Sequence, residues 1–252
     1  MITVGDAAIL LGAGAVAGLV GSAGGITSLV SYPALLAVGL PALSANVANI
    51  VALVGCWPGS ALASQPELEG KGPWLRRWAP LAAVGGAAGS VLLLATSAAT
   101  FARVVPFLVA GASLALLLEP RLARWRRKRR SQDSKLALPA GLLTLSVYNG
   151  YFGAGSGVMI LAILLLLVDR HLPRANALKN MLLGVGTLVS AAILTLSGSV
   201  SWSAAVPLGI GMFAGSSVGP HATRRLPPTI LRLVIALLGI GLAVELWLHP
   251  SF

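Results

Sequence analysis

Long uninterrupted aliphatic runs, such as those at 91–95, 114–118 and 159–168, are the feature that most constrains the fold. One bilayer crossing takes about 20 apolar residues, and every backbone polar group inside the hydrocarbon must be bonded within its own segment, so such runs form helices. Only 10% of the 252 residues are charged, against roughly 25% in a soluble domain. We therefore expect an all-α polytopic membrane protein that forms one integral membrane domain.

The formal net charge of +11 is concentrated, because seven of the ten residues at 121–130 are basic and lie between two apolar stretches. Juxtamembrane Lys and Arg collect on the cytoplasmic side and contact anionic headgroups. The expected partner of this charge is therefore membrane lipid and not nucleic acid. The single cysteine, Cys56, offers neither an intrachain disulfide nor a cysteine cluster for a metal, so no metal or cofactor is expected.

Apolar stretches between loop signals divide the chain into ten expected helical pieces. They cover roughly 6–21, 25–40, 43–63, 78–97, 101–118, 136–149, 152–168, 174–197, 202–219 and 228–248. The first, second and sixth have only about 14 to 16 residues and adjoin glycine clusters, so they are expected to be broken or re-entrant helices.

The chain also repeats itself. Residues 18–25 match residues 150–157, and Leu40-Pro41 matches Leu172-Pro173 at the same offset. Further on, 79–81 resembles 206–208, and an Ala-Gly-Ser triplet follows each. We expect a first repeat at 1–118, a basic linker at 119–135 and a second repeat at 136–252, with five helical pieces in each repeat. Because a unit of five pieces ends on the side opposite to its start, the second repeat must be inverted.

Basic residues fall in alternate loops, which predicts the orientation. The expected cytoplasmic loops of a bacterial plasma-membrane protein are 64–77, 119–135, 169–174 and 220–228. The intervening loops hold one basic residue, Arg103, so both termini are expected outside. Ten crossings and six crossings plus two re-entrant hairpins give the same sides, and both arrangements remain open.

Two matched glycine clusters, each with a serine, are the candidate substrate site. They comprise Gly21, Ser22, Gly24 and Gly25 in the first repeat and Gly153, Gly155, Ser156 and Gly157 in the second. Glycine permits φ > 0, so the chain can unwind there and expose backbone donors, and half-helix N-termini attract anions. The alternative is that these glycines are only small packing surfaces between helices.

The same strings resemble the TauE/SafE family, also called the sulfite exporter or toluene-sulfonate uptake family, over nearly the whole chain. The matching strings are Gly18-x-x-Gly21-x-x-Gly24-Gly25, Pro33, Gly39-Leu40-Pro41 and Asn149-Gly150-Tyr151-Phe152-Gly153-Ala154-Gly155-Ser156-Gly157. The resemblance implies a membrane transporter built from two related halves, with sulfite, sulfonates or related sulfur-containing anions as substrates. Ala23 and Ser156 stand where the family more usually has glycine.

Among the charged residues, Lys179 stands apart because it lies inside an expected apolar helix, near its amino end. Such a lysine either holds an anion or extends its ammonium to the headgroups, and its place resembles the family's second-half pattern. Asn176 and Asn180 beside it, with Asn46 and Asn49 in the first repeat, offer amide donors to an oxyanion, although intramembrane Asn also pairs between helices.

Acidic and histidine side chains lie in loops or near helix ends, so neither a carboxylate relay nor an enzyme is expected. The sequence therefore predicts a secondary transporter of a small anion, coupled to Na⁺ or H⁺ if it is coupled at all. Two alternatives remain. One is a passive anion channel, and the other is a membrane scaffold that uses the basic linker.

Overall fold

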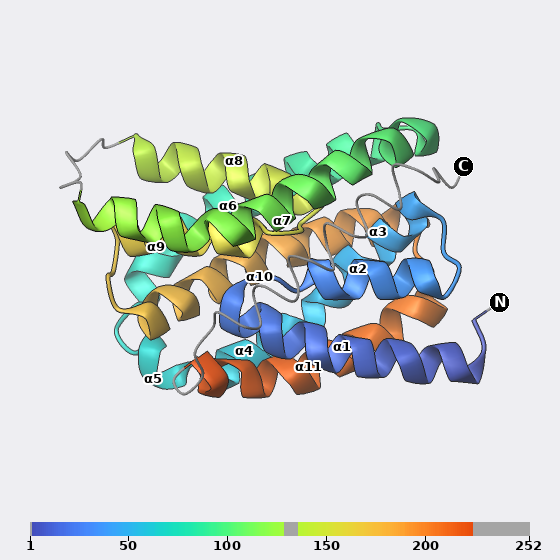
Figure 1. The fold of residues 1–252 in the computed structure, drawn as a ribbon, viewed down its shortest axis with the longest axis horizontal. Helices are drawn as coiled ribbons and strands as arrows, with labels where there is room; N and C mark the ends of the chain where they lie inside the picture. The colour runs from blue at the N-terminus through green and yellow to red at the C-terminus, as the bar shows by residue number, and fades with distance from the viewer. Residues whose placement is uncertain (1, 129–135, 224–252) are drawn as a thin grey trace.

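The computed structural model describes residues 2–128 and 136–223, which are helical apart from short connections (Figure 1). The elements are α1 (Val4–Gly24), α2 (Ser28–Ala37), α3 (Ala42–Ala52), a 3-10 turn (Leu53–Gly55), α4 (Cys56–Ala63), α5 (Gln65–Leu68), α6 (Gly72–Leu94), α7 (Ala98–Lys128), α8 (Ala137–Tyr151), α9 (Ser156–Leu167), α10 (Leu172–Leu196) and α11 (Trp202–Thr223). The all-helical prediction is confirmed. The expected piece 228–248 and parts of the expected loops 119–135 and 220–228 lie outside the described residues.

Several segments are long and apolar enough to cross a bilayer. They are Val4–Gly24, Ala42–Ala63, Gly72–Leu94 and Leu172–Leu196. The protein is accordingly an integral membrane protein with multiple candidate spans. Some helices overrun the expected loops: α6 starts inside 64–77, and α7 continues to Lys128 inside 119–135. Because Arg and Lys are good helix formers, a helix can continue through a basic segment, and apolar periodicity alone does not show this.

Two pairs of helices form hairpins that enter from opposite ends of the molecule (Figure 1). α1 runs inward from the end where the N-terminus lies, and α2 returns toward that end; α8 and α9 do the same from the other end. With 10 and 12 residues, α2 and α9 measure only about 15 and 18 Å at 1.5 Å per residue, against a hydrocarbon core of about 30 Å. Neither helix can cross alone.

The hairpin boundaries differ from the expected pieces for a local reason. α1 has 21 residues because the chain stays helical through Gly21 and Gly24 and breaks only at Gly25, where φ is 82°. α9 begins only after Gly153 and Gly155, whose φ values are 83° and 75°, so it is shorter than the expected 152–168. Left-handed backbone of this kind favours glycine.

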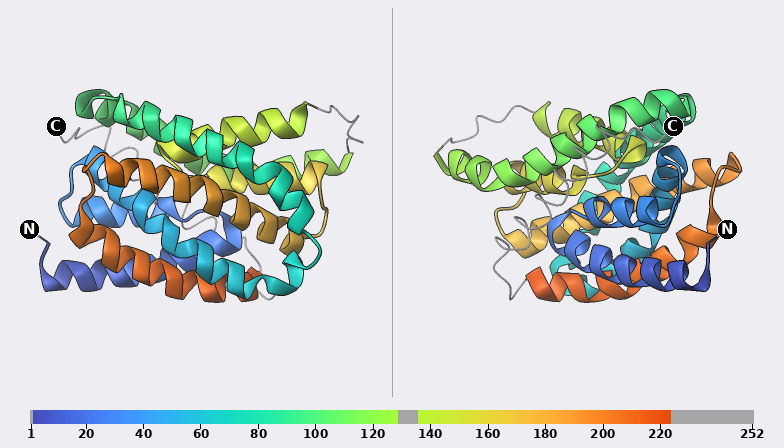
Figure 2. Two further views of the ribbon diagram at one scale, coloured as in Figure 1. Left: turned by 180° about the vertical axis from the view of Figure 1, so that it is seen from behind. Right: turned by 45° about the vertical axis from the view of Figure 1, so that its right-hand side comes forward.

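Each hairpin packs through its first helix against one long helix. α1 lies beside α11 on one side of the molecule, and α8 lies beside α6 on the other, with α10 between them (Figure 2). Glycines allow the backbones to touch: a Cβ at Gly211 or Gly215 of α11 would overlap a backbone carbonyl of α1, and one at Gly85 or Gly89 of α6 would meet a carbonyl of α8. Small residues at the contact are the usual way in which membrane helices pack closely.

Basic residues gather at one end of the bundle. Lys71 and Arg174 pair with Asp169 at 3.7 and 3.4 Å, which joins the turn before α6 to the turn before α10. The α2–α3, α6–α7 and α10–α11 connections lie at the opposite end, together with the N-terminus (Figure 1). The end that carries Asp169 is called the basic end below.

Candidate functional site

The tips of the two hairpins touch deep inside the bundle. A Cβ placed on Gly25 would overlap the backbone of Gly157, and a Cβ placed on Gly157 would overlap the backbone of Gly25. Both glycines are therefore needed for this contact. The structure thus brings together the two clusters that the sequence singled out.

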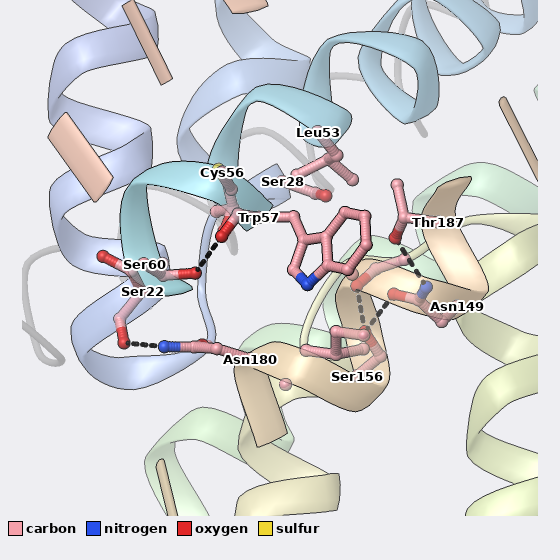
Figure 3. A pocket seen from close by; sticks show the side chains of 17 residues that line it. Ser22, Ser28, Leu53, Cys56, Trp57, Ser60, Asn149, Ser156, Asn180 and Thr187 are labelled. Carbon is pink, nitrogen blue, oxygen red and sulfur yellow. Dashed lines mark hydrogen bonds between the residues drawn. The ribbon is translucent and has the colours of Figure 1, made fainter. Parts of the chain in front are cut away.

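A cavity of about 50 Å³ lies beside this contact. A cavity needs about 10 to 15 Å³ to hold one water, so this cavity can hold a few waters or one small anion. Of the predicted site residues, it is lined by Gly21, Ser22, Gly25, Gly153, Ser156, Gly157 and Asn180. Its other polar lining residues are Thr27, Ser28, Trp57, Ser60, Asn149 and Thr187, none of which was singled out from the sequence (Figure 3).

The lining combines polar and apolar groups and carries no charged side chain among the described residues. Among the described residues that line the cavity, none is acidic or basic, whereas hydroxyl, amide and indole groups are numerous. α2 starts at Ser28 and α9 starts at Ser156, so both short helices begin at the cavity wall. The helix dipole makes a helix N-terminus weakly positive, which suits an anion.

A hydrogen-bonded network fixes the wall formed by α8, α9 and α10. Ser156 Oγ lies 2.7 Å from Asn149 Oδ1, to which it donates, and Asn149 Nδ2 donates to Thr187 Oγ1 at 3.2 Å (Figure 3). Asn149 therefore joins the start of α9 to α10. The three side chains are buried, so the low local dielectric strengthens these bonds.

The opposite wall is the C-terminal end of α1, where the Gly21 carbonyl accepts from the Gly25 N–H at 2.6 Å and side chains of α10 supply further donors. Asn176 and Asn180 of α10 both donate to the Ser22 carbonyl, at 2.8 and 3.0 Å. Lys179 donates to the Gly21 carbonyl at 3.2 Å and to Asn176 Oδ1 at 2.8 Å. Lys179 is completely buried, so the alternative in which its ammonium extends to the headgroups is wrong.

Because of these contacts, two of the three predicted site residues of α10 do not line the cavity. Lys179 and Asn176 face the end of α1 and do not line the cavity, so only Asn180 of the three does. A cation near a helix C-terminus stabilises it by charge complementarity with the exposed carbonyls. Lys179 is therefore placed to hold α10 against the hairpin.

The first-repeat asparagines also stand behind the lining. Asn49 donates to Ser28 Oγ at 3.0 Å and accepts from Ser31 Oγ at 2.6 Å, so it orients a serine that does line the cavity. Asn46 donates to the Tyr151 carbonyl at 2.9 Å, which ties α3 to the end of α8. Gly24 and Gly155 likewise lie outside the lining.

Thr187 could have been found from helical spacing once α10 was recognised as a cavity wall. Asn180, Gly184 and Thr187 recur at intervals of four and three, which places them on one helix face. Trp57 gives no such signal, because its place depends on how α4 packs. Within 2–128 and 136–223, no three His, Cys, Asp or Glu side chains gather as a metal site would require.

Comparison with known proteins identifies relatives of the whole chain. The family model described as "Sulfite exporter TauE/SafE" matches residues 7–246. A "Probable membrane transporter protein" of Haemophilus influenzae is 28% identical over 96% of both chains. The "Probable membrane transporter protein YfcA" of Escherichia coli K12 is 25% identical over 91% of this chain and 85% of its own. A "Probable membrane transporter protein ORF9" of Sinorhizobium is 26% identical over 97% and 93%.

No solved structure matches the chain significantly. The family match nevertheless covers nearly all of it and includes both hairpins. The chain therefore belongs to the sulfite exporter TauE/SafE family, which is a family of membrane transporters and not of enzymes.

Proposed function

We propose that this protein is a secondary transporter that carries a small sulfur-containing oxyanion, such as sulfite or a short sulfonate, across the bacterial plasma membrane by alternating access. The observation that carries the proposal is the small donor-rich cavity at the meeting point of the two hairpins. The family description supports a sulfur oxyanion, and the printed names of the relatives support transport.

Charge and size both favour a compact anion. The cavity wall combines two helix starts with neutral donors, and the Lys179 ammonium lies directly behind Gly21. No carboxylate lines it among the described residues, so nothing there repels a negative charge or attracts a cation strongly. A cavity of about 50 Å³ suits a substrate of a few heavy atoms and excludes an aromatic sulfonate in this conformation.

Inverted repeats are supported by equivalent contacts in the two halves. Gly18 of α1 corresponds to Gly150 of α8, 132 positions later, and Ala88 of α6 corresponds to Ala214 of α11, 126 positions later. These offsets relate two close contacts. The contact of Gly211 with the Leu11 carbonyl corresponds to the contact of Gly85 with the Leu143 carbonyl.

A second pair of contacts obeys the same offsets. The approach of Gly215 to the Ala15 carbonyl corresponds to that of Gly89 to the Val147 carbonyl. The hairpins enter from opposite ends (Figure 1), as an inverted pair should.

The packing suggests what moves. α1 and α11 form one closely packed pair, and α6 and α8 form the other. The hairpins meet at the glycine contact and at the Tyr32–Phe152 ring pair, and α10 holds the end of α1 through Asn176, Lys179 and Asn180. Rocking of one pair against the other would open the cavity first to one end and then to the other.

The arrangement favours six crossings plus two re-entrant hairpins, with the basic end in the cytoplasm and the N-terminus outside. Lys71, Arg76, Arg170 and Arg174 lie at or near the basic end, and Arg103 lies near the start of α7 at the other end. Na⁺ and H⁺ both remain candidates for the coupling ion.

Sulfite flux into proteoliposomes tests the proposal. We expect saturable uptake that is accelerated by unlabelled sulfite on the opposite face, because an alternating-access carrier shows counterflow and a channel does not. The double variant Gly25→Leu with Gly157→Leu should lose this flux, since both side chains would overlap the opposite hairpin. Unchanged transport by the double variant would refute the site, and single-channel currents would refute the carrier mechanism. Imposed Na⁺ and H⁺ gradients in the same vesicles identify the coupling ion.

A further inference from the structure

Trp57 reaches the cavity with a hydrogen-bond donor that nothing in the described structure uses. The residue follows the 3-10 turn in the first turn of α4, and its indole lines the cavity (Figure 3). Its Nε1 atom is buried and has no hydrogen-bond partner among the described residues. The other buried atom without a partner there is Asn46 Oδ1, which lies outside the cavity lining.

A buried donor without an acceptor is unfavourable, and native proteins keep few of them. The neighbouring polar groups of the cavity are already paired: Ser156 and Thr187 bond to Asn149, and Asn180 bonds to the Ser22 carbonyl. Thr187 is the acceptor in its bond, whereas Trp57 Nε1 is the atom of this wall that is buried and has no partner at all among the described residues.

The Trp57 indole packs directly against Gly184 on the facing helix α10. A Cβ at Gly184 of α10 would overlap the Cγ, Cδ1 and Nε1 atoms of Trp57, so no larger residue fits beside the nitrogen-bearing edge. Gly184 lies one helical turn after Asn180 and three residues before Thr187, both of which line the cavity. This packing keeps the N–H at the wall formed by α10.

We propose that the Trp57 indole N–H is a specificity-determining donor to an oxygen of the transported oxyanion. This inference rests on the proposed function and adds one residue to its site. An indole N–H donates and cannot accept, so it selects a ligand that presents a bare acceptor oxygen. The starts of α2 and α9 and the Trp57 N–H then contact different oxygens of one compact anion.

Trp57→Phe tests the inference, because it removes the N–H and keeps an aromatic ring. The control is Trp202→Phe, at the exposed start of α11 and outside the cavity lining. A hydrogen bond to a charged group predicts that Trp57→Phe weakens sulfite affinity roughly ten- to a hundredfold in KM and in equilibrium binding, while Trp202→Phe stays near wild type. Equal affinity in the two variants would overturn the inference.

A second replacement covers the case in which Trp57→Phe does not fold. Trp57→3-benzothienylalanine keeps the shape of the ring and replaces the N–H by sulfur. The same loss of sulfite affinity supports the inference, and wild-type affinity in this variant overturns it.

The outcomes distinguish a wrong substrate from a wrong role for Trp57. Absence of sulfite binding and flux in the wild type would remove the proposed substrate, and the role of Trp57 with it. Active wild type with an unaffected Trp57→Phe variant would remove only the role of Trp57.

Discussion

Contact between the hairpin tips predicts that Gly157→Ala and Gly24→Ala differ markedly in their effect on sulfite binding. At Gly157 a Cβ would overlap the Cα and carbonyl of Gly25, whereas at Gly24 a Cβ would meet nothing within 4 Å. Neither glycine has a left-handed φ, so alanine is compatible with the backbone at both. The pair therefore isolates the effect of the contact.

The size of the difference follows from two opposing effects. Gly→Ala within a helix stabilises by up to about 1 kcal/mol, and both positions gain this equally. Overpacking at Gly157 costs about 1 to 3 kcal/mol, because the overlapping atoms are backbone and must move apart. Gly157→Ala should therefore be about 1 to 3 kcal/mol less favourable than Gly24→Ala in the conformation in which the hairpin tips touch.

Sulfite affinity in nanodiscs and flux in proteoliposomes measure this difference. A difference of 1 to 3 kcal/mol corresponds to roughly 5- to 150-fold weaker binding if all of it acts on the closed conformation. Gly24→Ala should stay within about twofold of wild type, since the free-energy change there does not involve the cavity wall. Indistinguishable affinities for the two variants would show that the hairpins do not meet in the substrate-binding state.

Two further predictions concern the buried lysine and the orientation. Lys179→Met leaves the Gly21 carbonyl without its lysine donor and should lower thermal stability by roughly 1 to 3 kcal/mol, whereas Lys71→Met at an exposed ion pair should cost at most about 1 kcal/mol. Equal melting temperatures would contradict the structural role of Lys179. In a Cys56→Ala background, an impermeant thiol reagent outside the cell should label Ser199→Cys but not Glu69→Cys, because the two exposed positions lie at opposite ends of the bundle. The reverse labelling pattern would invert the topology.

Local features of the sequence accounted for the helical class and for the places where helices break. Apolar runs require helices in a bilayer wherever they occur, and Gly25, Gly153 and Gly155 supply the left-handed backbone at both hairpin tips. The extent of α1 and α7 could not be read in the same way, since Gly24 and the basic residues before Lys128 are compatible with both helix and loop.

Which residues line the cavity depends on how segments that are far apart in the chain pack together. Lys179 and Asn176 were expected to bind the substrate; in the structure they bond to the end of α1, while Trp57 and Thr187 lie on the cavity wall. Nothing in the neighbouring sequence of Trp57 shows that its indole lies against Gly184, more than a hundred residues away.

The sequence by itself determined that this chain crosses a membrane as helices, and it located the two glycine breaks, because both follow from the chemistry of neighbouring residues. Only the tertiary structure decided that Gly25 meets Gly157, that Lys179 is buried behind the cavity and that the Trp57 N–H has no partner among the described residues. Those outcomes depend on which helix faces lie against one another, and that is settled by packing among segments far apart in the chain.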